Sequence, residues 1–298
     1  MMQPGYRDYS TLHFLVLIWG FTSILGVLIS VNAPMLVLYR TALAGLIMLP
    51  VLVLNKQPLW PGWRAVSQMM VVGTLIAIHW YLFFVAARVT NVSACLAGIS
   101  TGALWTSFLE PLITRRPFRW FEPLLALLAV AGLYLIFLFQ FDKILGVLLG
   151  VASAGFAALF SVFNSIFSKK YQHQVVTFYE MVGAALFSLT AIVAFLSWPE
   201  ANLFDKPFIP TQMDVLYLLL LAGICTVYAY SESVLLMKKF TAFSMNLAIN
   251  MEPVYGILLA LLFFGKSETM HIGFYAGTLV IMSTVFVYPF LEKRLRSA

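Results

Sequence analysis

Long apolar stretches follow one another along almost the entire chain, separated by short polar connections. A helix of about 20 apolar residues, rising about 1.5 Å per residue, crosses the hydrocarbon core of a bilayer. Ten stretches of this length lie at residues 12–31, 35–54, 66–87, 92–113, 121–140, 144–167, 175–197, 213–236, 243–264 and 271–291. The sequence therefore predicts an all-α polytopic membrane protein with ten transmembrane helices.

The amino-acid composition excludes the other common classes of chain. Of the 298 residues, 62% are hydrophobic and 10% are charged, whereas about a quarter of a soluble domain is charged. This excludes an ordinary soluble domain, a disordered tail, and a nucleic-acid-binding domain with a basic water-facing surface. Cys95 and Cys225 lie within apolar stretches, so we predict that they pack in the interior and form neither a disulfide nor a metal site.

The Lys and Arg residues are distributed unevenly between the two ends of the predicted helices. With a cytoplasmic amino terminus, thirteen of the 18 lie in cytoplasmic segments and four lie in the opposite connections, while Arg40 lies within a span. Cytoplasmic loops retain positive charge during membrane insertion. We therefore predict a multi-pass protein of the cytoplasmic (inner) membrane with both termini in the cytoplasm. The net charge of +6 then reflects topology and requires no nucleic-acid partner.

The two halves of the chain are weakly similar to each other. Residues 88–97 match residues 239–248 at an offset of 151, and other matches follow in the same order along the chain. Each half would contain five spans, and because five is odd the second half must cross the membrane in the opposite sense. We therefore predict two five-helix inverted-topology repeats, residues 1–141 and 142–298, with a substrate site near the midplane between them.

Residues 250–256, which read Asn-Met-Glu-Pro-Val-Tyr-Gly and precede an apolar run, resemble the ninth-span motif of EamA-type members of the drug/metabolite transporter superfamily. Residues 19–20 and 39–40 are similar to the opening signatures of that family. The resemblance implies ten helices in two inverted bundles around a central cavity, and export or uptake of a small metabolite such as an amino acid. The first half departs from the pattern, since Thr101 stands where the second half has Glu252.

Inserting an ionisable side chain into the centre of a bilayer costs about 2.5–3.5 kcal/mol of free energy, so such side chains usually face a cavity or a partner. The candidates here are Arg40, His79, Glu180, Glu232 and Glu252. Arg40 and Glu180 occupy corresponding positions in the two repeats, so they are expected either to form an ion pair between the halves or to leave Arg40 free to grip a substrate carboxylate. Glu110 lies so close to Arg116 that we expect a headgroup-level ion pair outside the site.

The ninth stretch contains Pro253, which cannot donate a helical hydrogen bond and is expected to break the helix and act as a hinge. Asn246, Asn250 and Glu252 would then line a polar notch, unless Glu252 bonds the neighbouring backbone instead. Glu232 is either a proton-binding carboxylate or a headgroup-level residue beside the lysines that follow it. His79, the remaining candidate, is either a proton relay or a hydrogen-bonded structural residue.

Several aromatic residues lie deep in the predicted spans, where they pack the interior or line the cavity. They are Trp19, Tyr39, Trp80, Trp105, Tyr179 and Tyr230. A cavity walled by such rings suits an apolar or aromatic metabolite and can hold an ammonium group by cation–π attraction.

These features favour a secondary transporter, a probable exporter of small organic metabolites such as amino acids, that works by alternating access. A passive facilitator and a flippase of lipid-linked sugars or polyprenyl lipids remain alternatives. An enzyme is not predicted, because the chain has no His-Glu-x-x-His pair and the Gly-x-Ser-x-Gly string at 98–102 lies within a predicted helix. We predict a small-molecule substrate and contact with membrane lipid, and neither a cofactor nor a metal; no oligomeric state is predicted.

Overall fold

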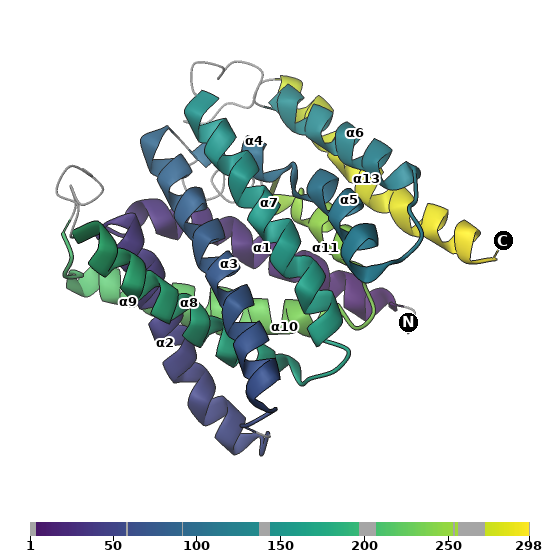
Figure 1. Cartoon of the computed structure of the whole chain (residues 1–298). Helices are drawn as coiled ribbons and strands as arrows, with labels where there is room; N and C mark the ends of the chain where they lie inside the picture. Colours follow the sequence, from purple (N-terminus) through teal and green to yellow (C-terminus); the bar gives the residue numbers. More distant parts are fainter. Residues whose placement is uncertain are drawn as a thin grey trace.

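The computed structural model describes residues 4–57, 59–90, 92–136, 144–196, 207–252, 254–255 and 272–297, and every regular element within them is a helix. The helices are α1 (Tyr6–Leu28), α2 (Ala33–Leu54), α3 (Trp63–Val89), α4 (Val92–Ile99), α5 (Gly102–Thr114), α6 (Phe121–Ile136), α7 (Ile144–Phe167), α8 (His173–Leu196), α9 (Gln212–Leu220), the π-helical segment η2 (Leu221–Tyr228), α10 (Ala229–Leu236), α11 (Ala242–Ile249) and α13 (Ile272–Ser297). Figure 1 shows them in one bundle.

Seven spans among the described residues are long and apolar enough to cross a membrane, which confirms a polytopic helical membrane protein. They correspond to the predicted first, second, third, sixth, seventh, eighth and tenth stretches. Of the other three, the fourth is split into α4 and α5, the fifth is the 16-residue α6, and the ninth continues beyond Tyr255 outside the described residues. The count of ten spans and the inverted repeat therefore stay predictions.

The fourth and ninth stretches are both interrupted near their middle. Between α4 and α5, the backbone N–H of Thr101 bonds the carbonyl of Gly98 at 3.1 Å, a tighter turn than that of an α-helix. At the end of α11, Asn250 bonds the carbonyl of Leu247 in the same way at 3.2 Å. The second interruption was expected, although Pro253 itself lies outside the described residues and its hinge role stays a prediction. The first has no proline at the break and was not predicted.

The eighth span is continuous but widens into a π-helix over η2. Thr226 Oγ1 donates to the carbonyl of Leu221, five residues earlier, at 2.9 Å. The carbonyl of Cys225 accepts a hydrogen bond from Trp19 Nε1 at 3.2 Å. A π-helical turn carries an extra residue, so it turns backbone and side-chain groups toward neighbours that a regular helix would not reach. Here those neighbours are α1 and α2.

Helices from the first and second halves of the chain are packed closely together. α3 packs along α7 and α8, α2 along α8, α4 along α7, and α6 along α13 (Figure 1). A methyl group on Gly98 would overlap the carbonyl oxygen of Val147 in α7, and one on Gly73 would overlap the carbonyl oxygen of Glu180 in α8. Glycine at these positions lets the helix backbones touch, as small residues do between membrane helices.

Charged side chains join several helices at one end of the bundle. Lys239 Nζ lies 2.8 Å from the Asp8 carboxylate, which ties the start of α1 to the connection before α11. Glu110 accepts hydrogen bonds from the first backbone N–H groups of α11, at 3.1 and 2.9 Å, and an ion pair from Arg116 at 3.1 Å. The expected Glu110–Arg116 pair is confirmed, and its carboxylate also caps a helix N-terminus. Both ends of the chain lie on the same side in Figure 1.

The opposite end is held by two charged side chains, the half-buried Arg88 and the buried Asp214. Arg88, at the end of α3, donates to the carbonyls of Gly26, Ile29 and Val31, at 3.1, 3.1 and 2.9 Å, and so satisfies the C-terminal end of α1. Asp214 caps the start of α9 and accepts from the backbone and hydroxyl of Ser30 at 2.7 and 2.6 Å. These contacts fix the ends of α1, α3 and α9 relative to one another.

Candidate functional site

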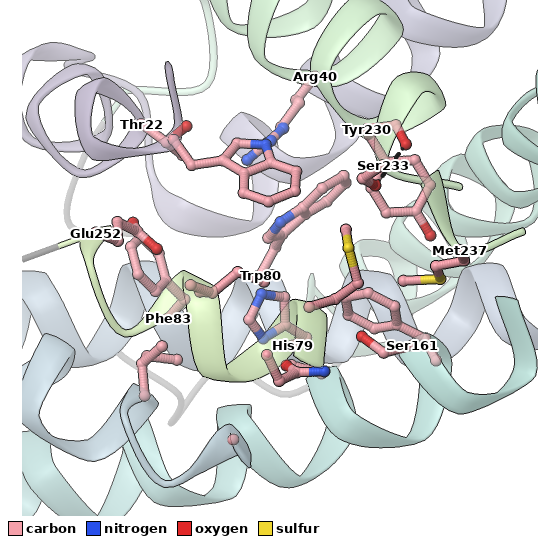
Figure 2. A pocket seen from close by; sticks show the side chains of 18 residues that line it. Thr22, Arg40, His79, Trp80, Phe83, Ser161, Tyr230, Ser233, Met237 and Glu252 are labelled. Carbon is pink, nitrogen blue, oxygen red and sulfur yellow. Dashed lines mark hydrogen bonds between the residues drawn. The ribbon is translucent and has the colours of Figure 1, made fainter. Parts of the chain in front are cut away.

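A cavity of about 100 Å³ lies between helices of the two halves, with room for several water molecules. Its walls come from α1, α2, α3, α5, α7, α10 and α11 and from the residues on either side of the α4–α5 break and after α11. Figure 2 shows Arg40, Tyr230 and Ser233 on one side of it and His79 and Ser161 on the other. We call this cavity the central pocket.

Arg40 is the charged centre of the central pocket. Its side chain is 2% exposed, its guanidinium carbon lies 3.7 Å from the centroid of the Trp80 ring, and its Nε donates to Thr226 Oγ1 at 2.8 Å. Stacking on an indole and a hydroxyl acceptor partly replace the water that a buried guanidinium loses. Arg40 Nη1 has no hydrogen-bond partner among the described residues. The guanidinium is therefore held in place with donors still available.

The expected ion pair between Arg40 and Glu180 does not occur in the described structure. Glu180 Oε2 instead accepts from the Tyr230 hydroxyl at 2.9 Å, with Asn164 Nδ2 3.5 Å away. The difference arises from η2, since the widened turn presents the Thr226 hydroxyl to Arg40. Arg40 and Glu180, which occupy corresponding positions in the two predicted repeats, thus bond to side chains of different helices.

The polar notch predicted around the ninth-helix break is only partly present. Glu252 is 8% exposed and lines the central pocket together with Asn246. Asn246 Nδ2 donates to the carbonyl of Ala242 at 3.0 Å, and its Oδ1 faces Gly102 at the other break. Asn250 is buried outside the lining, and its Nδ2 has no partner among the described residues. The two interrupted helices therefore meet at the pocket wall.

His79 is a hydrogen-bonded residue that also lines the central pocket, and its role as a proton relay stays a prediction. Its Nδ1 lies 3.0 Å from the carbonyl oxygen and 2.8 Å from the hydroxyl of Ser153, whose hydroxyl also donates to the His79 carbonyl. These bonds fix the ring against α7 while the ring lines the central pocket. The other ring nitrogen, Nε2, is the atom through which His79 can bind a solute.

Besides Glu180 and Asn250, four of the expected site residues lie outside the pocket lining. The Tyr39 hydroxyl donates to the carbonyl of Phe208 at 3.2 Å, and the Tyr179 hydroxyl donates to that of Leu59 at 2.5 Å, both in connections at helix ends. Trp105 is 42% exposed, and Glu232 is half-buried on another face of α10. Trp19 and Tyr230, by contrast, are part of the lining.

The lining also includes residues that the sequence did not single out as site residues. They are Thr22, Phe83, Ser161, Ser233 and Met237, among others, while Trp80, one of the deep aromatic residues, lines the pocket as one of the two alternatives expected. Thr22 lies three residues after Trp19, and Phe83 lies four residues after His79. Residues three or four apart share a face of a helix. The signal that could have found them was therefore their spacing from the charged and aromatic candidates.

Across the described part of the chain, no three His, Cys, Asp or Glu side chains gather in a way that could hold a metal ion. The chemistry that the central pocket offers is instead that of binding. It has one cation with free donors, one carboxylate, a histidine and several aromatic rings.

Comparison with known proteins identifies the family of this chain. No curated protein matches it significantly. A crystal structure, titled only as that of a protein, is 17% identical in sequence to this chain. The match covers 95% of this chain and 97% of the other chain with a TM-score of 0.71, so the two proteins share a fold. The sequence profile of the EamA-like transporter family matches residues 9–138 and again residues 144–288. The chain belongs to the EamA-like transporter family, in the drug/metabolite transporter superfamily, and is a membrane transporter.

Proposed function

We propose that this transporter is a secondary carrier that exports small organic metabolites such as amino acids from the cytoplasm by alternating access. The observation that carries the proposal is Arg40, a buried guanidinium with an unpartnered Nη1 beside a pocket between the two halves. A guanidinium binds a carboxylate through parallel hydrogen bonds. Glu252 and the ring of Trp19 on the same pocket wall suit the ammonium group of the same solute.

The proposal includes two inverted-repeat halves, residues 1–141 and 142–298, that rock against each other, with both termini in the cytoplasm. Two observations support it. The family profile matches the chain twice, and both interrupted helices reach the pocket from different halves. The start of α1 and the end of α13 also lie at one end of the bundle, where Arg119 lies 3.4 Å from Glu292.

Uptake of a panel of radiolabelled amino acids into proteoliposomes tests the proposal. The wild-type protein is expected to transport at least one of them. Arg40→Ala removes a charged hydrogen bond worth about 1.5–3 kcal/mol, so apparent affinity should fall by roughly ten- to a hundredfold. Arg40→Lys keeps the charge but loses the planar stack on Trp80 and should also bind more weakly. The exposed Arg64→Ala is the control and should transport normally.

Two results would contradict this proposal. Normal transport by Arg40→Ala, in protein inserted at normal levels, would show that Arg40 does not bind the solute. Absence of flux for every amino acid would remove amino acids as the substrate class and favour the flippase or another solute.

A further inference from the structure

Glu180 in α8 is a fully buried carboxylate at the centre of a small polar network. Its exposure is 0%, and its Oε2 accepts a hydrogen bond from the Tyr230 hydroxyl at 2.9 Å. Asn164 Nδ2 donates to the same hydroxyl at 2.6 Å and lies 3.5 Å from Oε2. Three helices, α7, α8 and α10, thus contribute one side chain each. We call these three residues the Glu180 network.

No cation faces Glu180 from the described helices packed against α8. On α2, the guanidinium of Arg40 is engaged by Trp80 and Thr226. On α3, the titratable groups within the span are His79, whose ring bonds Ser153, and Tyr81, whose neutral hydroxyl lies toward Ser188 of α8. Arg64 and Arg88 lie at the two ends of α3. The groups that α7 and α10 present to Glu180 are the amide of Asn164 and the hydroxyl of Tyr230, both neutral. An ionised carboxylate without a counterion is very costly in such a site, and a proton neutralises it.

The surroundings of Glu180 contain buried polar atoms without hydrogen-bond partners, and one added proton on Glu180 can satisfy them. Glu180 Oε1, Asn164 Oδ1 and Thr177 Oγ1 are all buried and have no partner among the described residues. Thr177 lies one turn before Glu180 on the same face of α8. A proton on Oε1 turns this oxygen into a donor, for which the amide oxygen of Asn164 and the hydroxyl of Thr177 are the acceptors at hand.

Tyr230 joins the Glu180 network to the central pocket. Its ring forms part of the pocket wall (Figure 2), while its hydroxyl bonds the carboxylate. For release, the protonated carboxyl group turns its O–H toward the Tyr230 oxygen, and the Tyr230 O–H turns from Glu180 toward water in the pocket. The Glu180 proton then passes to the Tyr230 oxygen as the hydroxyl's own proton passes to that water. The step leaves a carboxylate, an unchanged tyrosine and one hydronium ion, and the reverse step reloads the site.

We propose that Glu180 binds the proton whose exchange drives transport, and that Tyr230 carries it between Glu180 and the central pocket. This proposal rests on the proposed function, because it names the ion coupled to the same pocket. It assigns coupling to a residue beside the pocket, and leaves Arg40 and Glu252 to bind the solute. The proton site and the solute site can therefore be separated by mutation.

The protonation of Glu180 can be measured without any substrate. In purified wild-type protein in lipid nanodiscs at neutral pH, the infrared spectrum should contain the C=O stretching band of a buried carboxylic acid. Other buried carboxyl groups, Glu122 and Glu252 among them, can contribute to the same band, so the measured quantity is the intensity that each substitution removes. Glu180→Gln should remove part of the band, while Glu232→Gln, at a half-buried carboxylate outside the pocket on α10, should leave it unchanged. A band of unchanged intensity in Glu180→Gln, or no band in the wild type, would overturn the proposal.

Coupling is measured in proteoliposomes with an imposed pH gradient. With one proton exchanged per solute, a difference of one pH unit sustains about a tenfold accumulation, since both correspond to the same free energy. Glu180→Gln should still exchange solute but lose this accumulation, and Tyr230→Phe should lose it while keeping the infrared band. Wild-type flux that ignores the gradient would overturn coupling. Absence of flux for all amino acids would overturn the proposed substrate class instead, and the infrared band would still decide whether Glu180 holds a proton.

Discussion

The buried charged side chains of this transporter differ in how much of their hydrogen-bonding capacity is already used. Glu110 and Asp214 bond helix ends through several hydrogen bonds each. Arg40, Glu180 and Arg88 each keep a buried polar atom without a partner among the described residues, at a cost of about 1–3 kcal/mol for each such group. Their positions differ, because Arg40 lines the central pocket and Glu180 bonds Tyr230 in the pocket wall, whereas Arg88 bonds three carbonyls at the end of α1. We therefore interpret Arg88 as structural, and Arg40 and Glu180 as functional.

The structural class is tested by Arg88→Ala, which leaves the carbonyls of Gly26, Ile29 and Val31 without their donor. We predict that the free energy of unfolding falls by about 1–3 kcal/mol for each carbonyl left unsatisfied. Thermal unfolding in detergent measures it, with the exposed Arg64→Ala as the control that should melt like the wild type. Equal melting temperatures for the two variants would mean that water replaces Arg88 without cost.

Charge was a better guide to the site than any other property of a residue. Arg40, His79 and Glu252 could be predicted because a charged or titratable side chain inside a bilayer needs a reason. Thr22 and Ser161 were missed, because a hydroxyl in a helix often bonds a carbonyl in the preceding turn and so gives no signal of its own; only the spacing of Thr22 from Trp19 indicated its position. The partners of Arg40 also escaped prediction, because the π-helical register of η2 decides which hydroxyl faces it.

At the scale of helices, prolines indicate the irregular positions poorly. Pro50, Pro111 and Pro289 lie inside α2, α5 and α13, which continue through them. The break between α4 and α5 has no proline, and η2 has none. These irregularities all adjoin the central pocket. Packing around the pocket therefore determines them, and a single sequence does not contain that information in its local pattern.

The π-helical segment is tested by Thr226→Val, which keeps the shape of the side chain and removes the acceptor of Arg40 Nε. We predict up to a ten- to hundredfold weaker apparent solute affinity, because the hydrogen bond that positions the charged guanidinium is lost, and such a bond contributes about 1.5–3 kcal/mol. Flux measured over a range of solute concentrations gives the value. Thr190→Val, at an exposed position of α8, controls for loss of a helical hydroxyl. If both variants behave alike, Thr226 does not position Arg40.

Contact between helix backbones is tested by a pair of glycine substitutions. A methyl group at Gly98 would overlap the backbone of α7, whereas one at Gly223 meets nothing within 4 Å. We predict that Gly98→Ala is clearly destabilising, because α4 and α7 must move apart. Gly223→Ala should be neutral or slightly stabilising, as alanine favours a helix more than glycine does. Melting temperatures in detergent compare them, and a stable Gly98→Ala protein would show that α4 shifts freely.

At the scale of the whole molecule, hydropathy predicted which residues form apolar helices, but not which helices pack against one another. The predicted sixth stretch, 144–167, coincides with α7. The packing of α3 against α8, and of α4 against α7, depends on glycines whose partners lie far away in the sequence. No local pattern names such partners. The expected Arg40–Glu180 contact depended on such long-range packing, and in the structure Arg40 bonds Thr226 while Glu180 bonds Tyr230.

The ends of the bundle decide how a solute reaches the central pocket. The lining extends to Met237 and Met245, which lie on either side of the connection that contains Lys239. Lys239 is paired with Asp8 at the start of α1. A solute that enters from this end must pass between α1 and that connection. Under alternating access, these two segments therefore separate once in each transport cycle.

A chemical crosslink tests whether this end opens. After both native cysteines are replaced by alanine, Asp8→Cys and Lys239→Cys are joined by a short bifunctional maleimide, and flux is measured in proteoliposomes before and after the reaction. We predict that crosslinking abolishes flux. The control joins Phe108→Cys to Phe118→Cys, exposed side chains of the first half whose ring centroids lie 5.7 Å apart, and it should leave flux unchanged because it does not connect the two halves. Full flux through the Asp8–Lys239 crosslink would show that solute does not pass between these segments, and would restrict its path to the other pocket walls.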